Sequence, residues 1–187
     1  MEKRLFATAV FATAVSLVTG CSSAGPTADP SSKRRSIDAD VENAAAQLYA
    51  QVKGSRELVA KSRGILVFPK VVSAGLVLAG SYGEGSLQAS GSKTYYSTGS
   101  ASVGLTAGAE SKAVFILFLN DEALKKFQSS NGWTAGVDAS VTLAKVGADG
   151  GVDTETAKSP VIGFVLTNGG LMANLSIEGT KVTRMAL

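Results

Sequence analysis

The single cysteine of this 187-residue chain, Cys21, is the side chain with the clearest chemistry. A thiol ionises to a thiolate, which is a nucleophile and can be alkylated. Cys21 follows two basic residues at positions 3–4, an apolar stretch at residues 5–18 and a Thr-Gly pair. The apolar stretch is too short to span a bilayer, so we interpret residues 1–20 as an export signal.

The order of charge, apolar stretch, small residues and cysteine resembles the signal of bacterial lipoproteins. In that class the thiol receives a diacylglyceryl group, the preceding peptide is removed and the new N-terminus is acylated, as with palmitate. The resemblance implies acyl groups on Cys21 and no other cofactor. Ser22, in place of aspartate, implies sorting to the bacterial outer membrane, with the domain in the periplasm or at the cell surface. An ordinary secretory signal with a chance cysteine is the alternative.

Six basic residues could bind the phosphates of anionic lipids, and they fall in two groups. The first group lies in residues 22–36, a polar stretch with two prolines that we predict to be a flexible tether after Cys21. The second group flanks a predicted strand, where arginine can hold a phosphate through two hydrogen bonds. Solvated surface charge is the alternative for both groups. The six residues are Lys33, Arg34, Arg35, Lys61, Arg63 and Lys70.

The acyl groups should dominate membrane attachment. Each basic residue close to an anionic membrane contributes ~1 kcal/mol. Burial of an acyl chain contributes ~0.8 kcal/mol for each CH₂ group, and several chains anchor a protein stably. We therefore expect the cations at residues 33–35 only to tune how the domain sits at the membrane.

Composition excludes several classes of protein. The chain has no histidine, which excludes Ser–His and Cys–His dyads and histidine-rich zinc sites. Its net charge of +3, or +2 without residues 1–20, argues against a nucleic-acid binder. We predict that the protein is not an enzyme and binds neither metal nor nucleic acid. A hydrolase stays an alternative if a pocket holds a buried carboxyl group with a shifted pKa.

Three further features have weaker functional interpretations. Residues 80–85 (GSYGEG) lack the Gly-Lys-Ser/Thr ending of a phosphate-binding loop, so we predict a hairpin turn with Glu84 at the surface. Acidic residues alternate at positions 149–155 but fail the EF-hand calcium pattern. Trp133 and the tyrosines at positions 95–96 could be anchors at a membrane interface, although packing in the core is the commoner role.

Helical periodicity predicts the elements at the front of the domain. Apolar residues at helical spacing predict a helix over residues 37–53, with Ser36 as its N-cap. A second short helix is expected at residues 56–63, capped by Ser55. A third short helix is expected after Asn120, because acidic residues follow this N-cap and basic residues lie near the end.

From residue 64 the apolar period changes to two, which indicates strands. Residues 113–119 are nearly all apolar, so we expect a central strand covered on both faces. The pattern predicts an α+β fold, with N-terminal helices followed by a mainly antiparallel, strongly curved β-sheet or barrel with one short inserted helix. The other predicted strands cover residues 65–68, 71–81, 85–89, 103–109, 133–146, 161–167, 171–177 and 181–185.

Several stretches that occur in a fixed order resemble the SYLF lipid-binding domain, a Ysc84-type actin-binding-like family. The resemblance covers about residues 40–187, so we predict one SYLF-like domain over residues 37–187. The stretches are residues 60–70 (AKSRGILVFPK), 80–85 (GSYGEG), 103–110 (VGLTAGAE), 133–138 (WTAGVD), and 170–172 (GLM) with 175–181 (LSIEGTK).

Members of this family bind phosphoinositides and in some cases actin filaments, and the family also occurs in exported bacterial lipoproteins. The resemblance implies binding of phospholipid headgroups by a basic surface near the N-terminal helix. That helix here carries Asp38, Asp40 and Glu42, which departs from the basic helix of eukaryotic members. We expect an anchored lipoprotein that binds a phospholipid membrane, with anionic lipids as candidates. The alternative is a non-catalytic structural or interaction module with an envelope protein partner.

Overall fold

The computed structural model of the chain describes residues 29–75, 78–103, 108–145, 151–153, 156–167, 170–171 and 177–187. Within these ranges the helices are α1 (Pro30–Gln51), α2 (Ser55–Lys61) and α3 (Asp121–Ser129), with a 3-10 helix, η1 (Thr156–Lys158). The strands are β1 (Gly64–Gly75), β2 (Leu78–Ala89), β3 (Ser92–Val103), β4 (Gly108–Phe118), β5 (Trp133–Thr134), β6 (Thr142–Leu143), β7 (Val161–Thr167), β8 (Gly170–Leu171) and β9 (Lys181–Arg184).

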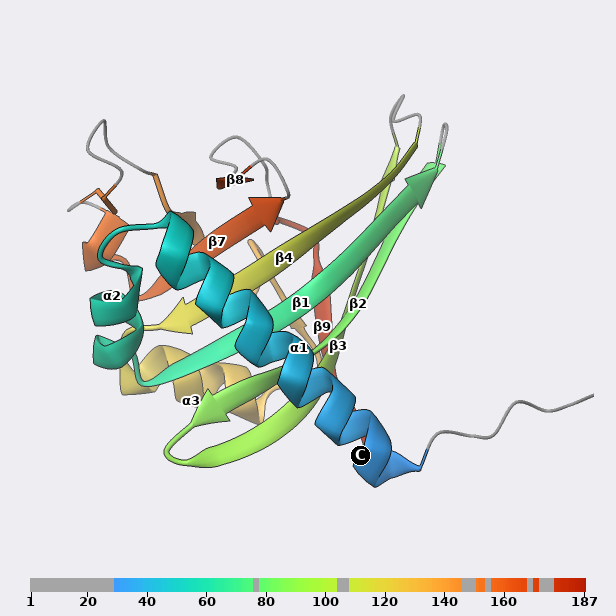
Figure 1. Cartoon of the computed structure of the whole chain (residues 1–187), viewed down its shortest axis with the longest axis horizontal. Helices are drawn as coiled ribbons and strands as arrows, with labels where there is room; N and C mark the ends of the chain where they lie inside the picture. Colours follow the sequence, from blue (N-terminus) through green and yellow to red (C-terminus); the bar gives the residue numbers. More distant parts are fainter. Residues whose placement is uncertain are drawn as a thin grey trace, which may run out of the picture.

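These strands form one sheet in the order β5-β9-β3-β2-β1-β4-β7-β6, with β8 beside β7. Neighbouring strands are antiparallel except for β6 and β7. The long strands β1 to β4 twist strongly, and α1 crosses the face that we call the outer face (Figure 1). Helix α3 packs on the opposite, inner face. The predicted α+β fold with a curved, mainly antiparallel sheet is confirmed.

A hydrophobic core lies on each face of the sheet, and strand β4 contributes to both because its side chains alternate between the two faces. Phe115 and Leu117 point to the outer face and pack with Leu48 of α1. Ile116 and Phe118 point to the inner face, where α3 packs. All four side chains on β4 are at most 2% exposed. The predicted central strand is confirmed, and burial on both faces explains its continuous hydrophobicity.

Helix α1 begins earlier than predicted. Pro30 occupies the first turn, where its missing N–H is not needed, and the Ser32 hydroxyl donates to the Asp29 carbonyl oxygen at 2.8 Å. The predicted tether over residues 22–36 is therefore wrong from Pro30 onward, and Ser36 is not the N-cap. The side of α1 that packs on the sheet consists of Ile37, Val41, Ala44 and Leu48.

Strand β1 continues through Pro69, where the sequence predicted that it stops. Val67 pairs with Ser86 and Lys70 pairs with Glu84, so β1 has one residue more than β2 between these pairs. This β-bulge accommodates a proline, which has no N–H for a regular ladder. The extra residue also changes the alternation, so that odd-numbered residues face outward before the bulge and even-numbered residues after it.

Residues 80–85 lie within β2 and form no hairpin turn, which corrects the prediction. Two glycines of this stretch lie where β1 approaches most closely. A Cβ atom added at Gly85 would lie 1.9 Å from the carbonyl oxygen of Val67, and one added at Gly83 would lie 2.9 Å from that of Lys70. The glycines therefore reflect close backbone approach at the bulge.

The segments after β4 confirm one prediction and correct two. Asn120 caps α3 as predicted, because its side chain accepts a hydrogen bond from the N–H of Ala123 at 2.8 Å. The strand expected over residues 133–146 is instead two short strands, β5 and β6, with a turn at Gly136, whose φ is +82°. The strand expected over residues 103–109 is divided between β3 and β4, and part of it lies outside the described residues.

The remaining predicted elements differ mainly in their boundaries. Helix α2 begins at Ser55, whose hydroxyl donates back to the Val52 carbonyl oxygen at 2.6 Å and so does not cap α2. The strands expected at residues 161–167 and 181–185 are confirmed as β7 and β9. The strand expected over residues 171–177 lies mostly outside the described residues, and β8 covers its start.

The aromatic residues that could have been interfacial anchors are mostly core residues. Trp133 is 2% exposed and lies edge-on to Phe127, with 5.5 Å between the ring centroids. Tyr96 is 5% exposed and lies 5.0 Å from the same ring, and burial raises the pKa of its hydroxyl. The anchor interpretation is therefore wrong for these two residues. Tyr95 is half-buried under α1, where its hydroxyl donates to Asp38 at 3.3 Å.

Candidate functional site

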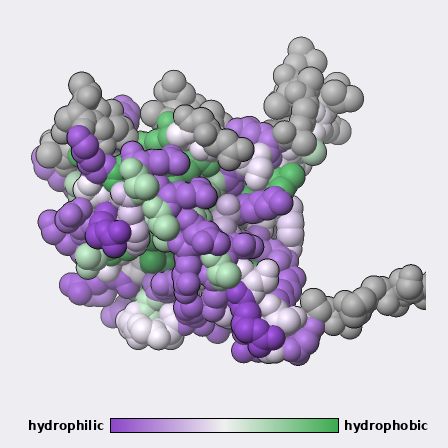
Figure 2. Space-filling view, in the orientation of Figure 1, coloured by the Kyte–Doolittle hydropathy of each residue, from purple (hydrophilic) through white to green (hydrophobic). Residues whose placement is uncertain are grey.

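A groove of about 570 Å³ opens on the outer face between the start of α1 and the strands β1 and β2. Val72 and Tyr82 are cross-strand partners that line it, and they are 40% and 57% exposed. Among the described residues, Val137 is the other large hydrophobic side chain with such exposure. The surface of the molecule on the side of α1 is mostly hydrophilic (Figure 2). We call this feature the α1 groove; Lys33, Lys70 and Glu84 also line it.

A hydrogen-bonded carboxylate lies in the α1 groove. Glu84 Oε1 accepts from Lys33 Nζ at 2.7 Å and from the Tyr82 hydroxyl at 2.8 Å. Burial acts to raise the pKa of Glu84, but these hydrogen bonds outweigh it and lower that pKa. Burial, followed by the bond to Glu84, raises the pKa of Tyr82. Glu84 is therefore ionised at neutral pH and balances the charge of Lys33, contrary to the prediction of a surface turn carboxylate.

Three other predicted cations lie at the same end of the domain. Arg34 and Arg35 are exposed on the first turns of α1, and Lys70 is exposed on β1 after the bulge. Arg35 donates to the Ser31 hydroxyl at 3.3 Å. Within the described residues, none of the three cations forms an ion pair with a carboxylate. Their charges are available to an anionic surface.

One of the early acidic residues of α1, Asp38, has a structural role that the sequence did not predict, whereas Asp40 is exposed and lines the α1 groove. The Asp38 carboxylate pairs with Lys93 of β3 at 3.0 Å, in addition to its bond from Tyr95. The hydrogen bond to Asp38 raises the pKa of Lys93. This polar contact attaches α1 to the start of β3.

Two of the six predicted cations lie elsewhere. Lys61 ends α2 and Arg63 precedes β1, where the Arg63 Nε atom lies 3.7 Å from the Asp121 carboxylate. Both side chains of this pair are more than half exposed, so the contact contributes little. The rise of a strand separates Arg63 from Lys70 by roughly 20 Å. The six cations therefore do not form one patch.

A comparison with protein families identifies the second half of the chain. The model of the family Ysc84, described as "Las17-binding protein actin regulator", matches residues 99–186. These residues match the SYLF domain of the Ysc84 family. The match runs from the middle of β3 through β9 and includes three of the five resembling stretches in full, those that begin at residues 103, 133 and 170. No curated protein matches the chain.

The α1 groove and the matched part of the SYLF domain adjoin along the sheet. All residues named in the groove precede residue 99, and β3, where the match begins, pairs with β2, which carries Tyr82 and Glu84. The description of the family names binding and regulation, and it names no catalysed reaction.

Several sequence hypotheses fall partly or wholly outside the described residues. Cys21 and the predicted export signal lie there, as does most of the acidic stretch at residues 149–155. In the described ranges, no three acidic side chains gather into a possible metal site. None of the described helices has the length and hydrophobicity of a membrane span.

Sequence reasoning missed Val72 and Tyr82 as exposed residues of the outer face. Their pairing depends on the register between β1 and β2, and the bulge at Pro69 shifts that register by one residue. Alternation counted from the buried run before Pro69 assigns Val72 to the wrong face. The available signal was the proline itself, which marks a bulge when it occurs inside an apolar strand pattern.

Proposed function

We propose that this chain is a membrane-anchored lipoprotein of the bacterial envelope whose SYLF domain binds phospholipid headgroups through the α1 groove. Acyl groups on Cys21 hold it at the outer membrane, and the domain lies in the periplasm or at the cell surface. The observation that carries the proposal is the exposed pair Val72 and Tyr82, bordered by cations at the end of the domain where the chain arrives from Cys21.

The position of the groove suits an anchored domain. Eight residues separate Cys21 from Pro30, where α1 begins, and eight residues span at most about 28 Å. The first turns of α1 therefore stay close to a bilayer that holds Cys21. Tyrosine suits the boundary between headgroups and acyl chains because its ring is apolar and its hydroxyl is polar.

The charges around the groove should orient the domain more than they hold it. Arg34, Arg35 and Lys70 each contribute about 1 kcal/mol near an anionic surface, while Lys33 is balanced by Glu84. This contribution is small beside the burial of the acyl chains, at ~0.8 kcal/mol per CH₂ group. The expected headgroup binding is thus weak without the anchor and sensitive to salt.

The second candidate is a non-catalytic structural or protein-interaction module of the envelope. The family description, which names the binding of a protein and the regulation of actin, favours this class of function. In this case the exposed side chains of the α1 groove contact a protein partner. The two candidates predict different behaviour on lipid vesicles that contain no protein.

Vesicle flotation tests the proposal. The full chain with Cys21→Ser, which removes the acylated thiol, is floated on neutral vesicles and on vesicles with added anionic lipid, at low and high salt. We expect more protein on the anionic vesicles at low salt, and a loss of this excess in the variant Arg34→Glu, Arg35→Glu, Lys70→Glu. Residues 5–18 are present in every protein compared, so their own affinity for vesicles cancels between variants.

A matched charge reversal at the other end of the domain is the control. The variant Lys61→Glu, Arg63→Glu changes exposed cations about 20 Å from Lys70 and should float like the parent chain. Equal flotation on neutral and anionic vesicles would overturn headgroup binding and favour the protein-interaction module. The anchor is tested separately, because labelled palmitate should enter the chain with Cys21 and not the Cys21→Ser variant.

A further inference from the structure

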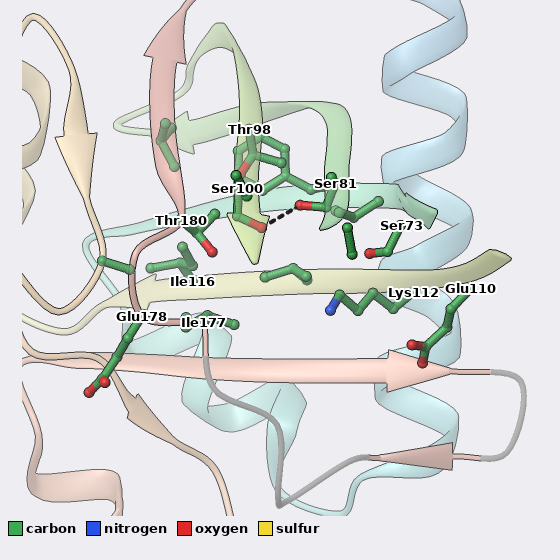
Figure 3. Close-up of a pocket in the computed structure, with 18 of the residues that line it drawn as sticks. Ser73, Ser81, Thr98, Ser100, Glu110, Lys112, Ile116, Ile177, Glu178 and Thr180 are labelled. Carbon is green, nitrogen blue, oxygen red and sulfur yellow. Dashed lines mark hydrogen bonds between the residues drawn. The ribbon is translucent and has the colours of Figure 1, made fainter. Parts of the chain in front are cut away.

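A second hollow lies on the inner face of the sheet, behind the strands that carry the α1 groove. It has a volume of about 260 Å³ and lies between β1 to β4, β5, β9 and the turn around Gly179 (Figure 3). Its deep wall is apolar, because Phe68, Trp133, Ala135 and Val182 line it and are at most 2% exposed. We call this hollow the inner cavity.

Hydroxyl groups line the outer part of the inner cavity. The pairing register aligns Ser100 with Ser81, Ser81 with Ser73 and Ser73 with Glu110, so these four residues cross four strands in one row. The Ser81 and Ser100 hydroxyls lie 2.7 Å apart and form a hydrogen bond (Figure 3). Thr98, two positions before Ser100 on β3 and on the same face, adds another hydroxyl to the lining. A row of hydroxyls beside an apolar wall is suited to an amphiphilic ligand.

The cation at the inner cavity is more buried than the carboxylates there. The Lys112 side chain is half-buried and lines the cavity, where it extends along β4 (Figure 3). No carboxylate pairs with Lys112 anywhere in the described ranges. Glu110 and Glu178 also line the cavity, but both are exposed, so solvent screens them, and the Glu178 carboxylate points away from the serines (Figure 3). The interior therefore offers a cation and hydroxyl donors to a negative group.

The size of the inner cavity limits the ligand. At ~30 Å³ for each water-sized group, the cavity holds roughly nine such groups, fewer than a lipid with two chains contains. The apolar wall of the cavity borders open space, and a hydrocarbon chain that filled this space would make favourable apolar contacts with the wall. A chain of about nine carbons fills this volume, with its small head at the open, hydroxyl-lined outer part of the cavity.

We propose that the inner cavity binds a single-chain anionic amphiphile, with its chain against Trp133 and Val182 and its acidic head on Lys112 and the serine hydroxyls. A carboxylate head and a phosphate head present the same chemistry to these donors. This site lies on the face of the sheet opposite the α1 groove and does not depend on the proposed function.

Calorimetric titration with three amphiphiles of equal chain length tests the site. The probes are decanoate, decyl phosphate and decyltrimethylammonium, each below its micelle concentration, with the full chain carrying Cys21→Ser. We expect the two anions to bind and the cation to bind at least tenfold more weakly. Lys112→Met should weaken decanoate binding about tenfold or more, because it removes a charged donor. Glu110→Gln should leave decanoate binding unchanged or strengthen it.

A matched pair of substitutions tests the location. Ser100→Phe places a ring in the inner cavity and should abolish decanoate binding. Ser97→Phe makes the same change on the other face of β3 and should preserve it, which also controls for effects on folding. Preferred binding of the cation, or decanoate affinity unchanged by Lys112→Met or Ser100→Phe, would overturn the proposal. Charge reversal at Arg34, Arg35 and Lys70 should leave decanoate binding intact. The proposals for this site and for the α1 groove can therefore be refuted independently.

Discussion

The substitution Gly85→Ala tests the explanation given for the glycines of β2. Gly85 lies opposite the bulge of β1, and its φ is not in the left-handed region. The cost of a side chain there is therefore steric. An added Cβ would lie 1.9 Å from the Val67 carbonyl oxygen and 2.8 Å from the Phe68 Cδ1 atom. Gly80→Ala is the matched control, because nothing lies within 4 Å of an added Cβ at that exposed position of the same strand.

The magnitude follows from which atoms must move. Overpacking a core typically costs about 1–3 kcal/mol when side chains can adjust. At Gly85 the obstacle is the backbone of Val67, which no rotamer change can relieve, so we expect about 3 kcal/mol or more. Val67 is itself 1% exposed and packs in the outer core, which restricts its movement. Gly80→Ala should change the free energy of unfolding by no more than ~0.5 kcal/mol.

Urea unfolding followed by Trp133 fluorescence measures this difference, because Trp133 is buried in the inner core. With an m-value of about 1–3 kcal/mol/M, the Gly85→Ala midpoint should fall by on the order of 1–2 M at unchanged slope. The Gly80→Ala midpoint should stay near that of the parent chain. Equal midpoints for the two variants would refute the claim that close backbone approach requires glycine at the bulge.

Three further substitutions probe other contacts. Asn120→Ala should destabilise the domain by about 1 kcal/mol in thermal unfolding, because it removes the cap bond to Ala123, whereas Asn120→Asp should not. Ser86→Ala should leave stability unchanged or raise it by up to about 1 kcal/mol, because the buried Ser86 hydroxyl has no hydrogen-bond partner in the described part of the chain. Glu84 has a lowered pKa in the folded state, so its contribution is complete above the ordinary glutamate pKa of about 4.3 and is lost as pH falls below it. Urea midpoints measured from pH 6 to pH 3 should therefore fall less in Glu84→Gln than in the parent chain, and equal falls would contradict the role of Lys33 and Tyr82 as its partners.

The elements that the sequence predicted correctly are those with local signals. The run at residues 113–119 is apolar at almost every position, and only a strand buried on both faces explains such a run. The cap at Asn120 and the acids after it are local signals that mark the start of α3. The resemblance to the SYLF family also came from short local stretches, and the family match contains most of them.

The elements that the sequence did not predict depend on contacts between distant segments. The first turns of α1 have no buried apolar residue before Ile37, so their composition resembles that of a tether. The ion pair between Lys33 and Glu84, which are 51 positions apart, lies outside any local pattern. The bulge at Pro69 likewise appears only when β1 is paired with β2. For this reason the sequence did not show that four of the six predicted cations lie at one end of the domain and that the other two, Lys61 and Arg63, lie far from them.

The two proposed sites share one pair of strands, and the alternation of those strands keeps them apart. After the bulge, Val72 and Tyr82 face the α1 groove, while Ser73 and Ser81 face the inner cavity. A β-bulge adds a single residue, and a shift of one residue exchanges the two faces of a strand. Without the bulge, β1 would present serine to the α1 groove and valine to the hydroxyl row. The bulge at Pro69 therefore does more than tolerate a proline, because it assigns the apolar and polar side chains of β1 to their separate faces.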